Sequence, residues 1–213
     1  MKITMNKLSV LAVAAAAALI CSQARATTIT WNFQENGSNV SLGNSSTFVE
    51  MGHSITAFGF AMPSTPSSLF AKLTVANPDE TGLGMVTDVG ADHEIDKTHF
   101  VQLDSMISPP ATIGGLGVAS IQLHEDAGVY GSNTLGVLGT WLTTMTADGS
   151  FDLSPWASTF RYFGVTTVGS ARLGNVLITS ISATTVPDGG TTALLLGLGL
   201  LGVASVARRF GVR

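Results

Sequence analysis

Alternation of apolar and polar residues is the feature that most limits how this chain can fold. In residues 27–35, Ile29, Trp31 and Phe33 alternate with threonine and asparagine. A period of two residues is typical of a strand with one buried face. Similar short stretches recur up to residue 183, separated by glycine, proline, asparagine and serine, without a helical period. The pattern therefore predicts an all-β domain.

Further strands are expected at residues 47–51, 54–62, 69–76, 98–107, 118–124, 135–145, 159–166 and 176–183. Residues 38–46 are polar and small and are expected to form a loop, as are Pro109–Pro110 and Gly114–Gly115. Many short strands at regular spacing favour a single antiparallel β-sandwich, for which we expect a jelly-roll-like strand order. A β-barrel is the alternative.

The first 26 residues have the pattern of a signal peptide. Lys2 and Lys7 precede the apolar run from Leu8 to Ile20, and Ala24–Arg25–Ala26 has the small residues of a cleavage site. The single cysteine, Cys21, lies inside this segment. We therefore expect a signal peptide at 1–26 and a cysteine-free β-sandwich domain at 27–185, without disulfides.

Residues 186–213 have three parts in a fixed order. A short motif, Val186–Pro187–Asp188–Gly189–Gly190, precedes the uncharged, leucine-rich run Thr191–Ala207, and Arg208 and Arg209 follow at once. A membrane span needs about 17–25 apolar residues, and basic flanks stay on the cytoplasmic side. The sequence predicts a transmembrane helix with the domain outside. A buried core helix is the alternative, which the arginines and the lack of a polar face disfavour.

This tail resembles the tripartite C-terminal sorting signal of PEP-CTERM proteins, and in particular its VPDSG variant. Asp188 stands where the commonest form has glutamate, and Gly189 replaces the serine of the variant. The resemblance implies recognition by an exosortase, a membrane cysteine protease-transpeptidase of bacteria that make exopolysaccharide. It also implies processing near Val186–Pro187–Asp188 and release or transfer to the cell surface.

The charge of the chain is unevenly distributed. The whole chain has a net charge of −4, but residues 27–187 hold four basic and thirteen acidic residues, which gives −9. A domain this acidic does not bind nucleic acid by neutralising phosphates. Cations, neutral glycans or basic partners suit it better.

The densest polar cluster is residues 88–96. If this segment is extended, Asp92, Glu94 and Asp96 project from one face and form a candidate Ca²⁺ site. The EF-hand pattern is absent, and a solvated acidic loop is the alternative. The four histidines have no metal-binding spacing, and they are expected to be scattered over the surface and the strands.

Two aromatic residues are candidates for stacking on sugar rings. Tyr130 precedes a Gly–Ser–Asn turn and Trp156 follows Ser154–Pro155, so both are expected to be exposed in loops. Trp31 is expected in the core because it lies on the apolar face of its strand.

The sequence holds no Gly-x-Ser-x-Gly, no His-Glu-x-x-His and no P-loop. We therefore expect no enzymatic activity. The expected function is that of an exported surface or extracellular-matrix protein with a structural or adhesive role associated with exopolysaccharide. A calcium-dependent carbohydrate-binding module and, less favoured, a secreted glycan hydrolase are the alternatives.

Overall fold

The structure, a computed structural model, describes residues 26–34, 39–74, 80–87, 92–169 and 175–185, together with Gly197, Gly199 and Gly202. Residues Thr28–Thr185 form one compact unit. The signal peptide, the motif Val186–Gly190 and the arginines Arg208 and Arg209 lie outside the described residues, as does nearly all of the expected tail helix. Within the described part of the chain, no helix is both long and apolar enough to span a membrane.

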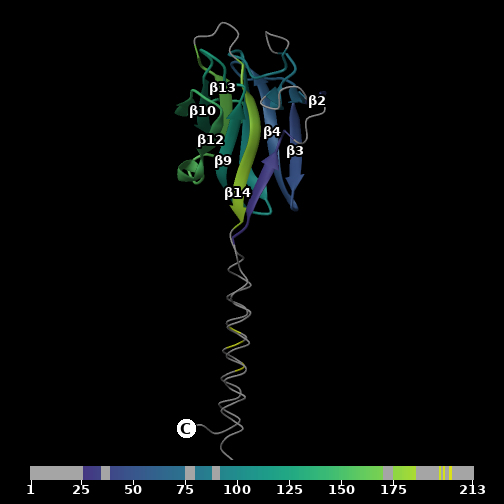
Figure 1. Cartoon of the computed structure of the whole chain (residues 1–213). Coiled ribbons are helices and arrows are strands. Elements are labelled where there is room, and N and C mark those ends of the chain that lie inside the picture. The colour runs from purple at the N-terminus through teal and green to yellow at the C-terminus, as the bar shows by residue number, and fades with distance from the viewer. Residues whose placement is uncertain are drawn as a thin grey trace, which may run out of the picture. The chain divides into compact units, whose positions relative to one another are not determined.

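The compact unit contains two antiparallel sheets (Figure 1). Sheet A has the order β12-β9-β14-β7-β6-β2, and β1 also pairs with β14. Its strands are β1 (Thr28–Asn32), β2 (Val40–Gly43), β6 (Leu69–Lys72), β7 (Gly82–Met85), β9 (Ala111–Ala119), β12 (Gly149–Asp152) and β14 (Leu177–Thr185).

Sheet B has the order β11-β10-β13-β8-β4-β3, and β5 also pairs with β4. Its strands are β3 (Ser45–Glu50), β4 (His53–Ala61), β5 (Thr65–Pro66), β8 (His99–Ser108), β10 (Ala127–Ser132), β11 (Thr140–Met145) and β13 (Tyr162–Thr167). A 3₁₀ turn, η2 (Ser154–Trp156), follows β12. The prediction of an all-β domain of antiparallel strands is confirmed, and the jelly-roll order stays a prediction.

Both sheets contribute side chains to one hydrophobic core. In β1, Ile29 and Trp31 are buried, and Thr28 and Thr30, which alternate with them, are exposed, as the alternation predicts. From sheet B, Leu103 and Phe163 are fully buried in the same cluster. At about 25 cal/mol per Å² of apolar surface, burial of such side chains is the main stabilising contribution. The packing of two sheets around a shared core is the arrangement of a β-sandwich.

The sequence reading was wrong for several segments. Gly114–Gly115 was expected in a loop but lies inside β9, which pairs with β12 on one side and β14 on the other. There the amide of Gly115 donates a 2.7 Å hydrogen bond to Ser182 Oγ, and a Cβ on Gly115 would lie 3.2 Å from that oxygen. Glycine therefore makes room for a cross-strand hydroxyl, rather than marking a break. The expected loop at 38–46 contains β2.

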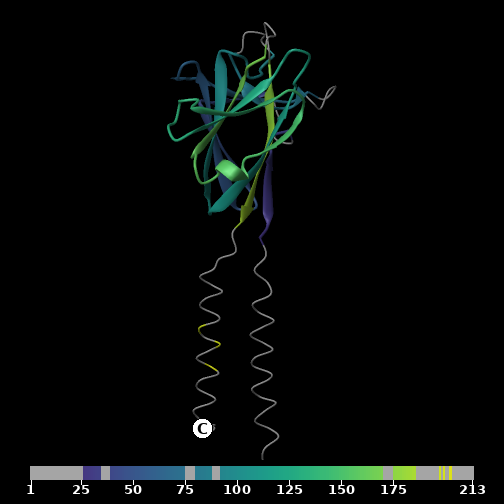
Figure 2. The ribbon, with the colours of Figure 1, turned by 90° about the vertical axis from the view of Figure 1, so that its left-hand side faces the viewer.

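The domain has two distinct ends. Thr28 at the start of β1 pairs with Thr184 near the end of β14, so the domain begins and ends at the same end of the sheet. There β1 and β14 lie side by side, as Figures 1 and 2 show. The other end of β14 begins beside the bridge between Ile95 and Val176. Since β14 has nine residues, these ends are about 30 Å apart at roughly 3.3 Å per residue. The predicted acidic site lies at the second end.

Candidate functional site

The segment around Glu94 lies directly on β7, and glycine makes this possible. A Cβ on Gly84 would lie 2.0 Å from the carbonyl oxygen of His93, closer than any real contact. His93 stacks on Phe70 of β6 with ring centroids 4.0 Å apart, and Ile95 exchanges two backbone hydrogen bonds with Val176. These contacts fix residues 93–95 across β6, β7 and the start of β14.

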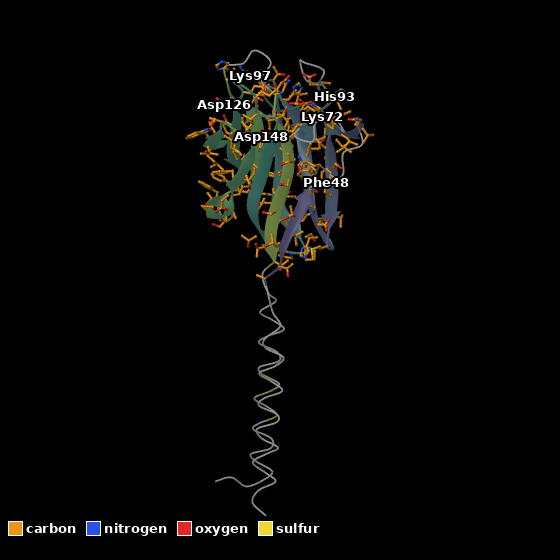
Figure 3. All side chains as sticks on the ribbon, in the orientation of Figure 1. Phe48, Lys72, His93, Lys97, Asp126 and Asp148 are labelled. Carbon is orange, nitrogen blue, oxygen red and sulfur yellow. The ribbon has the colours of Figure 1, made fainter. Side chains whose placement is uncertain are left out.

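Glu94 is held in a buried polar cluster. Its side chain is 5% exposed, and its Oε1 contacts Lys72 Nζ at the end of β6. Its Oε2 accepts a 2.9 Å hydrogen bond from Ser120 Oγ, just after β9. Glu80 Oε2 lies 3.9 Å from the same Lys72 nitrogen. Burial raises the pKa of Glu94, and the nearby Lys72 opposes this shift only in part. Figure 3 shows Lys72 and His93 near each other at this end of the domain.

Asp96 belongs to a second cluster. Its Oδ1 lies 2.8 Å from His99 Nδ1 and accepts hydrogen bonds from the amide and hydroxyl of Thr98. The other ring nitrogen, His99 Nε2, lies 3.1 Å from the hydroxyl of Thr87. Asp96 and His99 are buried, whereas Thr87 is exposed. A carboxylate, an imidazole and a surface hydroxyl therefore form one hydrogen-bonded chain, an arrangement of the kind that activates a hydroxyl as a nucleophile.

The three carboxylates of the predicted calcium site do not have the arrangement that was expected. Asp92, Glu94 and Asp96 were expected on one face of an extended segment, but each has different partners. Asp92 Oδ2 lies 3.4 Å from the side-chain amide of Asn175, whereas the other two belong to the clusters above. Among the described residues, no three His, Cys, Asp or Glu side chains come together as metal ligands. Calcium binding itself stays a prediction.

An aromatic face lies on sheet B. Tyr130 is in β10, not in the turn that the sequence indicated, and it is paired with Trp141 of β11. Residues paired across a ladder project from the same face of a sheet. Trp141 is 58% exposed, and its Nε1 donates a 3.2 Å hydrogen bond to Thr144 Oγ1, which orients the indole along its strand. We call Tyr130 and Trp141 the aromatic face.

Glycine also shapes this face. A Cβ on Gly128 would lie 2.8 Å from Tyr130 Cε2 and 2.7 Å from a methyl of Val168. The Tyr130 ring and the 40% exposed Val168 therefore lie close above the backbone of β10. The result is an apolar surface on the outside of the sheet, beside its edge strand β11.

Trp156 lies elsewhere. It is half-buried in η2, and its ring stacks on Phe151 of β12 with centroids 5.3 Å apart. Phe151 belongs to the edge strand of sheet A, whereas Tyr130 belongs to sheet B. Of the two aromatic residues singled out in the sequence, Tyr130 thus belongs to sheet B, whereas Trp156 packs on an edge strand of sheet A. Tyr130 is instead paired with Trp141. The local sequence did not single out Trp141, because exposed and core tryptophans look alike on a short alternating strand.

Comparison with known proteins identifies the tail. Residues 185–210 match the family model described as the VPDSG-CTERM motif. No curated protein and no solved structure matches the chain. The match confirms the resemblance of the C-terminal segment, and such a motif implies processing by an exosortase-type membrane protease. It supports export of the protein by way of the membrane. The chain thus carries a PEP-CTERM-type sorting domain of the VPDSG kind.

Proposed function

We propose that the domain is a non-catalytic adhesive module of the bacterial cell surface or extracellular matrix, which associates with exopolysaccharide through the aromatic face. The observation that carries this proposal is the pairing of the 58% exposed Trp141 with Tyr130 on the outside of sheet B. Among the aromatic side chains that the structure describes, all except Trp141 are buried or half-buried, so the exposed indole beside the half-buried Tyr130 is informative.

The chemistry of the aromatic face suits a neutral sugar polymer. The apolar faces of sugar rings pack on aromatic rings, and the rings of Tyr130 and Trp141 have polar atoms at their edges. An extended polymer can lie along a sheet surface without requiring a deep pocket. The charge of −9 between residues 27 and 187 disfavours strongly anionic polymers. The sorting signal supports this proposal, because such a motif implies export of the protein by way of the membrane.

The binding test is retention on polysaccharide. The purified full-length protein in detergent is passed over the exopolysaccharide of its own host and over a panel of neutral insoluble polysaccharides. Trp141→Ala is expected to reduce retention at least about tenfold, the equivalent of about 1.4 kcal/mol. Met106→Ala is the matched control, because Met106 is 67% exposed on the same sheet but outside the aromatic face. Equal retention of both variants and the wild type would refute the assignment.

The location of the mature protein is tested by its mass. Protein recovered from the host's culture medium and membranes is expected to end near Val186–Pro187 and to lie outside the inner membrane. A mass that includes Thr191–Arg213, found only in the inner membrane, would mean a permanent anchor and would exclude a role in the matrix.

The calcium-dependent form of this proposal has its own test. Addition of Ca²⁺ to metal-free protein would raise the melting temperature if the ion binds near Asp92, Glu94 and Asp96. Asp92→Asn should abolish the rise, because Asp92 is the exposed member of the three. An unchanged melting temperature would leave an adhesive module that does not depend on calcium.

Hydrolysis of a glycan ester is a second candidate function. It is favoured by the hydrogen bonds that link Asp96 to His99 and His99 to Thr87. A hydroxyl beside an imidazole that is oriented by a carboxylate is the arrangement of hydroxyl-based acyl transfer. The assay is release of acetate from acetylated polysaccharide by the full-length protein. Release that is lost in Thr87→Ala but kept in Thr65→Ala, another exposed threonine, would support it. No release would favour the non-catalytic module.

A further inference from the structure

The buried pair of Lys72 and Glu94 has a chemical possibility that an ordinary surface ion pair lacks. Both side chains are largely removed from solvent, with 12% and 5% of their surfaces exposed, and Nζ directly contacts Oε1. Burying two opposite charges carries a desolvation penalty that their attraction offsets only in good geometry. Formation of a neutral amide would remove both charges while keeping β6 and the segment around Glu94 together.

We propose that Lys72 and Glu94 condense into an intramolecular isopeptide bond, which joins β6 to the segment that lies across β7. The proposal rests on the contact between the two groups, on their burial, and on the polar side chains of Ser120 and Glu80 beside them. It is independent of the aromatic face and of any glycan.

The atoms balance without a co-reactant. The Lys72 ammonium gives one proton to the Glu94 carboxylate, which yields an amine and a carboxylic acid. Nζ then attacks Cδ of Glu94, the N–C bond forms, and the bond from Cδ to the hydroxyl oxygen breaks. The hydroxyl leaves as water with a second proton from the nitrogen. The products are one amide and one water molecule.

The neighbouring groups have defined roles in this reaction. Glu80 Oε2, 3.9 Å from Nζ, can carry the second proton from the nitrogen to the leaving oxygen. Ser120 Oγ, 2.9 Å from Oε2, can stabilise the negative charge that develops there during the attack. The raised pKa of Glu94, caused mainly by burial, favours the neutral acid that the attack requires.

The fold supplies the proximity. Lys72 pairs with Gly82, and Gly84, two residues further along β7, lets the backbone at His93 and Glu94 approach that strand. Groups held in such fixed geometry react with effective molarities that reach about 10⁵–10⁸ M. The link would close a loop from residue 72 to residue 94 and restrict the unfolded chain, as a disulfide does. The expected domain at 27–185 has no cysteine with which to form a disulfide.

The test is a peptide map of the wild-type, full-length protein isolated from its host. Trypsin normally cuts after both Lys72 and Lys97. The cross-link would block cleavage after Lys72, so the peptide that ends at Lys97 would extend back past residue 72 and would be lighter by one water. Cleavage after Lys97 is the internal control for complete digestion. Separate peptides that end at Lys72 and Lys97, each with its sequence mass, would overturn the proposal.

Variants identify the bond. Lys72→Arg is expected to restore cleavage after residue 72 and the full sequence mass, and a water loss that persists there would contradict the assignment. In Glu94→Gln the same bond would form with loss of ammonia instead of water. Glu80→Gln is expected to lower the cross-linked fraction without disturbing the fold, because the Glu80 side chain is 33% exposed and glutamine has nearly the same size. An unchanged fraction would refute the role given to Glu80.

Discussion

Gln102 provides the sharpest test of how the outside of sheet B is built. Its side chain is fully buried on β8, and its two ends bind the connection between β10 and β11. Oε1 accepts a 2.7 Å hydrogen bond from the Gly136 amide, and Nε2 donates a 2.7 Å bond to the Val137 carbonyl. The opposite residue on β13 is Gly164, which leaves space for Leu138 over the sheet.

Gln102→Ala should destabilise the domain by about 2–4 kcal/mol. A buried amide that loses its partner costs about 1–3 kcal/mol, and this applies to the buried Gly136 N–H. The Val137 carbonyl adds about 1 kcal/mol, because Val137 is 47% exposed and water can replace the lost donor. Gln122→Ala makes the same chemical change at an exposed glutamine, and its effect should stay within about 0.5 kcal/mol.

The assay is urea denaturation of the full-length protein in detergent, followed by far-ultraviolet circular dichroism. Hydrogen exchange at the Gly136 amide is a local readout, and it should accelerate in the Gln102 variant. A loss below about 1 kcal/mol, or an unchanged exchange rate at Gly136, would refute the claim that this side chain fixes the connection.

Two further predictions concern the end of the domain that holds Glu94. Gly84→Ala should destabilise the domain by about 1–3 kcal/mol, because its Cβ would meet the His93 carbonyl, whereas Gly149→Ala, with open space around it, should have little effect in the same denaturation assay. Lys72→Met leaves Glu94 as a buried carboxyl with neither its cation nor the proposed bond, so the pKa of Glu94 should rise further and stability should fall as the pH increases from 4.5 towards neutrality. The loss relative to wild type should reach about 3 kcal/mol at neutral pH and shrink near pH 4.5, and a loss that is equal at both pH values would contradict this reasoning.

The sign of the pH effect follows from the order of the pKa values of Glu94 in the folded and the unfolded states. The folded state raises the pKa of Glu94 above 4.5, so between the two values the folded protein binds more protons than the unfolded chain. Stability therefore falls as the pH rises through this window and is recovered as the acid becomes protonated. The measurement is the melting temperature of the Lys72 variant and the wild type across the window.

Local patterns in the sequence were sufficient to predict the fold class of the domain and the sorting signal in the tail. Alternation at Ile29, Trp31 and Phe33 predicts a half-buried strand, because side-chain direction in a strand depends only on residue parity. The motif at residues 186–190, the apolar run and Arg208–Arg209 are contiguous, so their order alone identifies the sorting signal. Charge is likewise a property of composition and needs no fold.

Only the tertiary structure decided which side chains meet. Glu94 looked like one of three ligands for a cation, but the packing of its segment on β7 brings it to Lys72, 22 positions away in the chain. Trp141 becomes the partner of Tyr130 because a bulge in the β10–β11 ladder sets their register. Such pairings depend on strand order and register, which result from the packing of the whole domain, whereas strand identity depends on residues that are adjacent in the sequence.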